Sequence, residues 1–164
     1  MLAILNCHPC NVRWFSGDTD IPALAAMGIS QTDIYDVLDR PGGRIHVAEM
    51  EFSRGPLRKP DHVVAGVLMY EQMKKPSRIL VRRLRVLDEL TRMGVGSLMW
   101  RKLASKSAEL GASVIALVDE HDDAAVKWLH HRGPVCTRLV RGAFDEADGV
   151  RFVFRGGNIL TECG

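Results

Sequence analysis

The chain has 164 residues, of which 46% are hydrophobic and 26% are charged, the size and composition of one globular domain over residues 1–164. Its formal net charge of +2 is too small to indicate nucleic-acid binding, and no stretch approaches the roughly 18 apolar residues that span a bilayer. The short apolar start has no basic leader and no small-residue cleavage site. We therefore expect a cytoplasmic protein, monomeric or homodimeric, without a nucleic-acid or membrane partner.

The cysteines give a weak signal. Cys7 and Cys10 have the spacing of half a redox or metal site. A thioredoxin-type motif should open a helix, whereas residues 11–15 have the pattern of a strand, and zinc would need further ligands from Cys136, Cys163 or scattered histidines. We expect reduced thiols and no metal, with redox and metal roles for the pair as the alternatives.

The first part of the chain predicts a strand and two helices. The strand fits Val12–Ser16, and a helix follows over Ile21–Met27, which Asp18 and Asp20 can cap. A second helix fits Thr32–Leu38, with its threonine as the cap and apolar residues on one face.

Three strands come next. Ile45–Phe52 alternates between polar and apolar residues, and Val63–Tyr70 is an almost unbroken apolar run suited to a central strand. Between them, Ser53–His62 contains two prolines and a glycine and is predicted to be a loop. Arginines interrupt the apolar residues of the third strand, Ile79–Leu87.

The remaining elements alternate. Val95–Leu110 has the clearest helical pattern, a buried strand fits Ser113–Val118, and Asp122–Arg132 is a helix whose charges match its macrodipole. Val135–Arg141 and Val150–Arg155 form a closing hairpin. This order predicts an α/β fold with a mixed, mostly antiparallel sheet of six to seven strands, flanked by about four helices.

The most informative segment is a strand that passes through a two-glycine loop into the long helix. The first backbone N–H groups of a helix lack partners, and together with the helix dipole they bind a pyrophosphate. Gly94 and Gly96 leave those amides open to phosphate oxygens, and Arg92 adds a cation. A dinucleotide-binding motif would place a third glycine where Met99 stands, and the Gly-Lys-Ser/Thr of a P-loop does not follow.

Leu84-Arg85-Val86, followed by Arg92-Met93-Gly94-Val95-Gly96, resembles the acetyl-CoA-binding motif of the GNAT acetyltransferases, Arg/Gln-x-x-Gly-x-Gly/Ala after a strand. Downstream, Asp122, Ala125 and Gly133 match the Asn-x-x-Ala spacing of the family and the glycine of its Gly-Phe ending. The resemblance extends over about Val63–Arg155, and within the family the chain resembles ribosomal-protein and N-terminal N-acetyltransferases.

The resemblance implies a fold in which the third predicted strand splays from the strand Ser113–Val118. Pantetheine of acetyl-CoA, or of another acyl-CoA, fills the opening, and a primary amine of a protein, peptide or small molecule attacks the thioester directly. A backbone N–H near Val86 would stabilise the oxyanion. The resemblance assigns the coenzyme to Leu84, Arg85, Val86, Arg92, Met93, Gly94, Val95, Gly96, Ser97, Asp122 and Ala125.

The sequence departs from the family at the positions that usually carry charge or transfer protons. The Arg/Gln of the loop falls on Thr91, and the tyrosine that acts as the general acid falls on Leu129. The two alternative glutamate bases fall on Leu117 and near Leu80. A base could come instead from Asp119, which shares the strand parity of Leu117, or from His121. The alternative is that Asp119 and His121 only cap the following helix.

Each of two further pairs of charged residues has two possible interpretations. Glu49 and Glu51 could face an amine, and Arg83 and Arg85 could meet an acidic substrate or a coenzyme phosphate, while a solvated sheet face is the alternative for both pairs. Two functions therefore stay open. The first is an N-acetyltransferase acting on a primary amine, and the second is a GNAT-fold module that binds acyl-CoA with little or no turnover.

Overall fold

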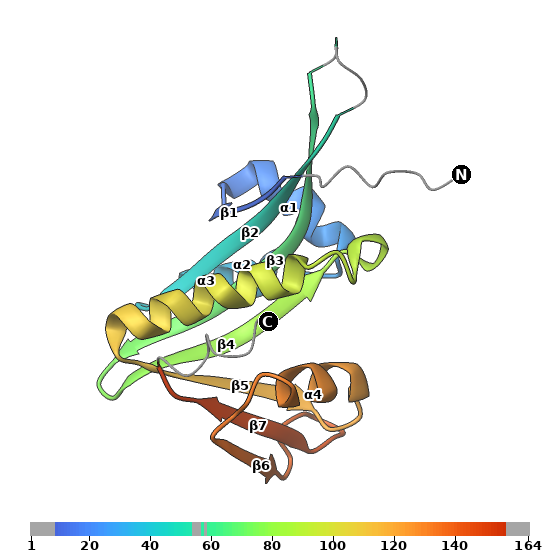
Figure 1. The fold of residues 1–164 in the computed structure, drawn as a ribbon. Helices are drawn as coiled ribbons and strands as arrows, with labels where there is room; N and C mark the ends of the chain where they lie inside the picture. The colour runs from blue at the N-terminus through green and yellow to red at the C-terminus, as the bar shows by residue number, and fades with distance from the viewer. Residues whose placement is uncertain (1–8, 54–56, 58, 157–164) are drawn as a thin grey trace.

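A seven-stranded sheet forms the centre of the molecule (Figure 1). The computed structural model describes residues 9–53, 57 and 59–156. Within this part of the chain the strand order is β1-β2-β3-β4-β5-β7-β6, and every neighbouring pair is antiparallel except β4 and β5. The strands are β1 Cys10–Trp14, β2 Gly43–Phe52, β3 Asp61–Lys74, β4 Ser77–Val86, β5 Ser113–Asp119, β6 Cys136–Val140 and β7 Gly149–Phe154. The predicted α/β class, the element order and the mixed, mostly antiparallel sheet are confirmed.

Four α-helices of the described residues cover the sheet. They are α1 Gly17–Ala26, α2 Gln31–Leu38, α3 Val95–Leu110 and α4 Asp123–His130. Helices α3 and α4 pack on one face through a core that includes Trp100, Leu103 and Phe152. Helices α1 and α2 lie on the other face against β2 and β3, with Leu24 and Ile34 fully buried (Figure 1). None of the described helices combines the length and apolar character needed to cross a membrane.

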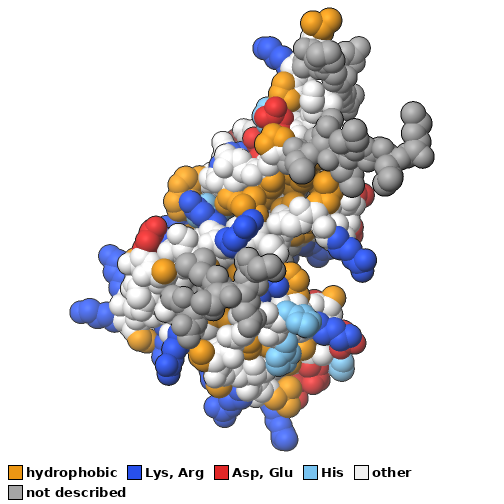
Figure 2. Space-filling model, viewed as in Figure 1, with side chains coloured by type: hydrophobic (Ala, Val, Ile, Leu, Met, Phe, Trp, Pro, Cys, Tyr) orange, Lys and Arg blue, Asp and Glu red, His pale blue; other side chains and the backbone are white. Residues whose placement is uncertain are grey.

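The space-filling view shows that the outline of the molecule is indented (Figure 2). The indentation lies between the part that carries β4 and the part that carries α4, and blue Lys and Arg side chains stand at its rims. In the ribbon view β4 and β5 lie apart at the same place (Figure 1).

The predicted caps of the first two helices are wrong, although the helices exist. Helix α1 begins at Gly17, four residues before the predicted start, so Asp20 lies inside it. Ser30 caps α2, because its hydroxyl accepts the N–H of Asp33 while the Asp33 carboxylate accepts the N–H of Ser30. Thr32 therefore lies within the first turn of α2, since this capping box outcompetes a threonine two residues later.

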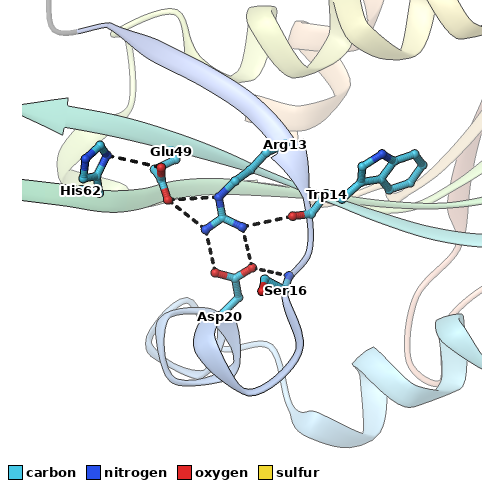
Figure 3. Close-up of polar contacts among 6 residues, drawn as sticks. All are labelled: Arg13, Trp14, Ser16, Asp20, Glu49 and His62. Atoms are coloured by element: carbon cyan, nitrogen blue, oxygen red, sulfur yellow. Dashed lines mark hydrogen bonds and ion pairs between the residues drawn. The ribbon is translucent and has the colours of Figure 1, made fainter.

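Asp20 belongs instead to a partly buried ionic network that joins α1 to the sheet edge (Figure 3). The guanidinium of Arg13 donates to both Asp20 oxygens at 2.8 and 2.9 Å and to Glu49 at 2.9 and 3.0 Å. Asp20 also accepts the Ser16 N–H, and Glu49 contacts His62 at 3.3 Å. Burial favours a raised pKa for Asp20, but the hydrogen bonds from Arg13 and Ser16 leave that pKa below its ordinary value. Glu49 is thus an ion-pair partner of Arg13 on this edge.

Strand ends differ from the predictions by a few residues. Strand β1 starts two residues earlier than predicted, and β3 extends at both ends, so that Asp61 and His62 belong to the strand rather than to the loop. Residues 54–56 and 58 of that loop lie outside the described residues, as do Cys7 and Cys163. Cys10 is half-buried, which raises the pKa of its thiol, and Cys136 is exposed. The role of the Cys7–Cys10 pair stays untested.

Candidate functional site

Strands β4 and β5 pair only at their beginnings. The last matched residues are Val81 and Ala116, after which β4 continues along β3 and β5 continues along β7. The two strands therefore diverge and leave two facing backbone edges, one over the end of β4 and one over Leu117–Asp119. This is the splay that the family resemblance implies, and it coincides with the indentation in Figure 2.

A β-bulge in β4 accompanies the divergence. Met69 pairs with Arg83 and Tyr70 with Val81, so Arg82 is an extra residue without a counterpart in the register with β3, although its side chain pairs with Glu71 of that strand. A bulge bends its strand and increases the local twist. The bulge therefore lies at the point where β4 leaves β5.

The backbone of β4 offers hydrogen-bonding groups to the opening. Leu87 N–H donates to Ala65 of β3 at 2.8 Å. Because the N–H and C=O of one strand residue point to the same side and neighbouring residues alternate, those of Val86 and Leu84 point away from β3. Leu84 and Val86 are thus placed as a coenzyme in the opening would require, and the Arg85 backbone is turned towards β3.

The loop after β4 aims the start of α3 at the same opening. Arg92 and Gly94 both have left-handed backbone conformations, with φ of 66° and 82°. Gly94 is the N-cap of α3, no side chain caps the helix, and its first turn carries no acidic residue. The first-turn N–H groups of α3 thus have no side-chain partner of the kind that an anion could replace.

The space around Gly96 bears on whether a phosphate can approach the start of this helix. A Cβ added at Gly96 would lie 3.6 Å from both Val86 and Trp128, which is ordinary contact. The fold itself therefore does not demand a glycine at this position, although Gly94 needs one for its positive φ. A bare backbone at the first turn of a helix suits the close approach of pyrophosphate oxygens, so the residues present fit a coenzyme.

Arg132 supplies a cation at this place that the sequence analysis missed. Its guanidinium donates to the Ser97 hydroxyl at 2.9 Å and to the Trp128 carbonyl at 3.0 Å, and it lies 3.2 Å from the centre of the Trp128 ring. Arg132 thus fixes the end of α4 against the first turn of α3. The helical charge pattern indicated only a basic residue near the end of α4, and no local signal connects it to Ser97.

Asp122 and Ala125 have a structural role that explains their spacing. The Asp122 carboxylate accepts the Ala125 N–H at 3.0 Å and caps α4. Their predicted part in coenzyme binding stays a prediction.

The two candidate bases sit at the open end of β5, but their side chains do not meet. Asp119 Oδ1 accepts the backbone N–H of His121 at 2.8 Å, which closes the turn before α4. The imidazole of His121 is 76% exposed and lies 3.6 Å from Glu120. Leu117 is exposed and Leu129 is buried. A catalytic role for Asp119 and His121 stays a hypothesis.

Two hollows described in the structure lie elsewhere. One of about 190 Å³ is enclosed by β1–β3 and α3 around Trp14, His46 and Tyr70. The other, of about 430 Å³, lies near Gly42 and Lys74. Neither includes residues of the splay, which is an open notch between two strands, and the coenzyme argument rests on the backbone geometry there.

Comparison with known proteins agrees with this geometry. The model of the Acetyltransferase (GNAT) family matches residues 15–133. Among solved structures, Arabidopsis thaliana NAA60 in complex with acetyl-CoA superimposes with a TM-score of 0.72 at 13% identity, covering 90% of this chain and 98% of that one. Ard1 from Thermoplasma volcanium gives 0.68 at 20% identity, with coverages of 89% and 97%. The ribosomal-protein-S18-alanine N-acetyltransferase of Escherichia coli gives 0.67 at 12%, with coverages of 90% and 94%.

At these identities the structural neighbours establish the fold alone. No curated protein matches the chain in sequence. The family model, however, matches well over half of the chain, from the end of β1 to the turn after α4. The protein is a member of the GNAT acetyltransferase family.

Proposed function

We propose that the protein transfers an acetyl group from acetyl-CoA to a primary amine. The observation that carries this proposal is the junction of a splayed β4–β5 pair with an uncapped helix start. A ligand that combines an extended amide chain with a pyrophosphate fits both parts at once. Arabidopsis NAA60 and an Elizabethkingia anophelis GNAT protein, both similar in fold, were crystallised with acetyl-CoA.

Each part of the coenzyme has a proposed partner. The pantetheine amides bind the backbone groups of Leu84 and Val86 as an added strand would. The pyrophosphate binds the backbone amides of the loop and the first turn of α3 over Arg92–Ser97, where the dipole and the nearby guanidinium of Arg132 favour negative charge. Bound in this way, acetyl-CoA presents a thioester whose carbonyl carbon forms the new C–N bond while the C–S bond breaks and coenzyme A leaves.

The contribution of the protein is then mainly positioning. The Val86 N–H, directed into the opening, is placed to stabilise negative charge on the carbonyl oxygen. A primary ammonium must lose a proton before attack, and we assign this step to Asp119 and His121 at the open end of β5, or to water that they order. The released thiolate takes up a proton from solvent, since the family tyrosine position is the buried Leu129.

The second candidate function is an acyl-CoA-binding module with little or no turnover. Leucines at positions 80, 117 and 129, together with the engagement of the Asp119 carboxylate in a turn, favour it. This candidate shares the coenzyme site with the first and differs only in chemistry.

Thermal unfolding with added ligands tests the coenzyme assignment. At a hundredfold excess over its dissociation constant, acetyl-CoA should stabilise the protein by about 2.7 kcal/mol, a rise of roughly 5–11 °C in melting temperature for a chain of this size. Equal stabilisation by NAD or ATP would contradict the assignment. A panel of amines and peptides, with detection of released thiol, then separates the transferase from the binding module.

A further inference from the structure

One face of the sheet is left open beside the splay. Ala116 of β5 and Phe152 of β7 pack into the core under α3 and α4. Successive strand residues point to opposite faces, so Leu117 and Arg151 lie on the other side. On that side α1 and α2 pack mainly against β2 and β3, and no described helix makes comparable contacts with β7 or β6.

Two arginines stand directly opposite each other on this open face. Arg151 of β7 pairs in register with Arg138 of β6 on one side and with Leu117 of β5 on the other. Like charges in directly opposed positions destabilise a sheet. Within the described residues neither arginine has an ion-pair partner, and the buried Nε of Arg151 makes no hydrogen bond. The described residues therefore leave both guanidinium charges without a carboxylate partner.

Two nearby carboxylates already accept backbone hydrogen bonds. Asp119, on the same face of β5, accepts the His121 N–H, and Asp148 accepts the Gly142 N–H at 2.8 Å. The opposite wall of the splay is basic as well, because Leu84 and Val86 pack against the core and so place Arg83 and Arg85 on the same side of the sheet, beside α1 and α2. Of these two, Arg83 makes only a long contact of 3.8 Å to Asp33.

This basic face adjoins both an apolar surface and the proposed position of the thioester. Leu117, the first β5 residue beyond the last β4–β5 pair, is 40% exposed, and Phe144 is 39% exposed. Both side chains lie close to Gly149, where an added Cβ would lie 2.9 Å from Leu117 and 3.1 Å from Phe144. Arg151 is one strand away from Leu117 and Arg138 two strands away, which is about 5 and 10 Å along the sheet.

From this arrangement we propose that the acceptor amine carries an anionic group, a carboxylate or a phosphate, which Arg151 and Arg138 bind while the amine faces the splay. The assignment rests on the proposed transferase function. Leu117 and Phe144 would contact the apolar linker between the two ends of the acceptor. Arginine pairs suit both anions, since the planar guanidinium donates two parallel hydrogen bonds to either.

Matched acceptors that differ only in charge provide the test. Suitable pairs are β-alanine and β-alaninamide, phosphoethanolamine and ethanolamine, and short peptides with Asp or Asn in second position. We expect kcat/KM for the anionic member of at least one pair to exceed that of the neutral member by about tenfold or more. The pair that responds identifies whether a carboxylate, a phosphate or an acidic peptide is the source of the anion.

Substitution of the arginines sharpens the result. Arg151→Gln and Arg138→Gln should raise KM for the anionic acceptor about tenfold or more and leave kcat/KM for the neutral analogue and KM for acetyl-CoA unchanged. Arg101→Gln, on the exposed side of α3, makes the same change in net charge and should alter nothing. Calorimetric titration of the same anions into the protein with coenzyme A present measures their dissociation constants in the absence of turnover.

The outcomes separate the two assignments. If acetyl-CoA binds and neutral amines are acetylated as well as anionic ones, the anionic-acceptor inference is wrong and the transferase stands. Anion binding that survives both arginine substitutions would also overturn the inference. If acetyl-CoA itself does not bind, the proposed function fails.

Discussion

Replacing Gly96 with aspartate should weaken coenzyme binding while leaving the fold at least as stable as before. The position lies in the first turn of α3, and its Cβ would meet Val86 and Trp128 at 3.6 Å without strain. Aspartate in the first turn of a helix is favourable, because it complements the macrodipole and Gly96 currently leaves that end without an acidic residue. In the presence of a bound pyrophosphate the same carboxylate becomes a repulsive neighbour.

The two effects can be sized separately. Replacing glycine by aspartate in a helix gains about 0.3 kcal/mol in propensity, and the dipole adds about 0.3–1 kcal/mol, which together raise the melting temperature by roughly 1–5 °C. A carboxylate about 5 Å from one phosphate charge costs about 3 kcal/mol at an effective dielectric constant of 20, a loss of more than a hundredfold in affinity.

Calorimetric titration with coenzyme A and a thermal melt of the free protein measure the two quantities. The control is Gly96→Ala, which removes the glycine without adding charge. It should gain roughly 2–4 °C and keep its affinity, because the family pattern accepts alanine here. If folded Gly96→Asp binds coenzyme A as tightly as the wild type, the start of α3 is not the phosphate site and the argument is refuted.

Three other perturbations follow from the geometry. Asp20 has a lowered pKa in the folded state, so the stability it contributes is present above about pH 4 and is lost as the pH falls through the folded pKa. In urea melts, Arg13→Met should therefore lower the free energy of unfolding by about 3–5 kcal/mol at pH 7 and by clearly less at pH 3. An equal cost at both pH values would contradict the network. Gly94→Ala, at φ 82°, should lose about 1–2 kcal/mol in the same melts. Asp119→Asn and His121→Ala, assayed separately over a range of pH, should each lower kcat at least tenfold with coenzyme affinity intact if they transfer the proton, whereas wild-type rates would assign both to the turn before α4.

The sequence predicted what depends on long patterns and missed what depends on single contacts. The bounds of α3 were predicted to the residue, because sixteen residues of amphipathic pattern end at a glycine in the left-handed conformation. The cap of α2 was misplaced by two residues, since serine and threonine both cap helices and the reciprocal bond of Ser30 with Asp33 decides between Ser30 and Thr32. The contact of Arg132 with Ser97 joins residues 35 positions apart, and no local pattern encodes such a pair.

The bulge in β4 is an intermediate case, because its signal was present in the sequence but was not used. Ile79 and Val81 face the α3 core, and so do Leu84 and Val86. The inward positions thus change from odd to even numbers, and a strand with strict alternation cannot do this without one extra residue. The two consecutive arginines, Arg82 and Arg83, mark the slip. That single residue has two consequences for function. It accompanies the separation of β4 from β5, and it turns Arg83 and Arg85 to the face opposite α3, where the acceptor is proposed to bind. The bulge therefore sets which residues of β4 face α3 and which face the opposite side, beside the proposed acceptor site.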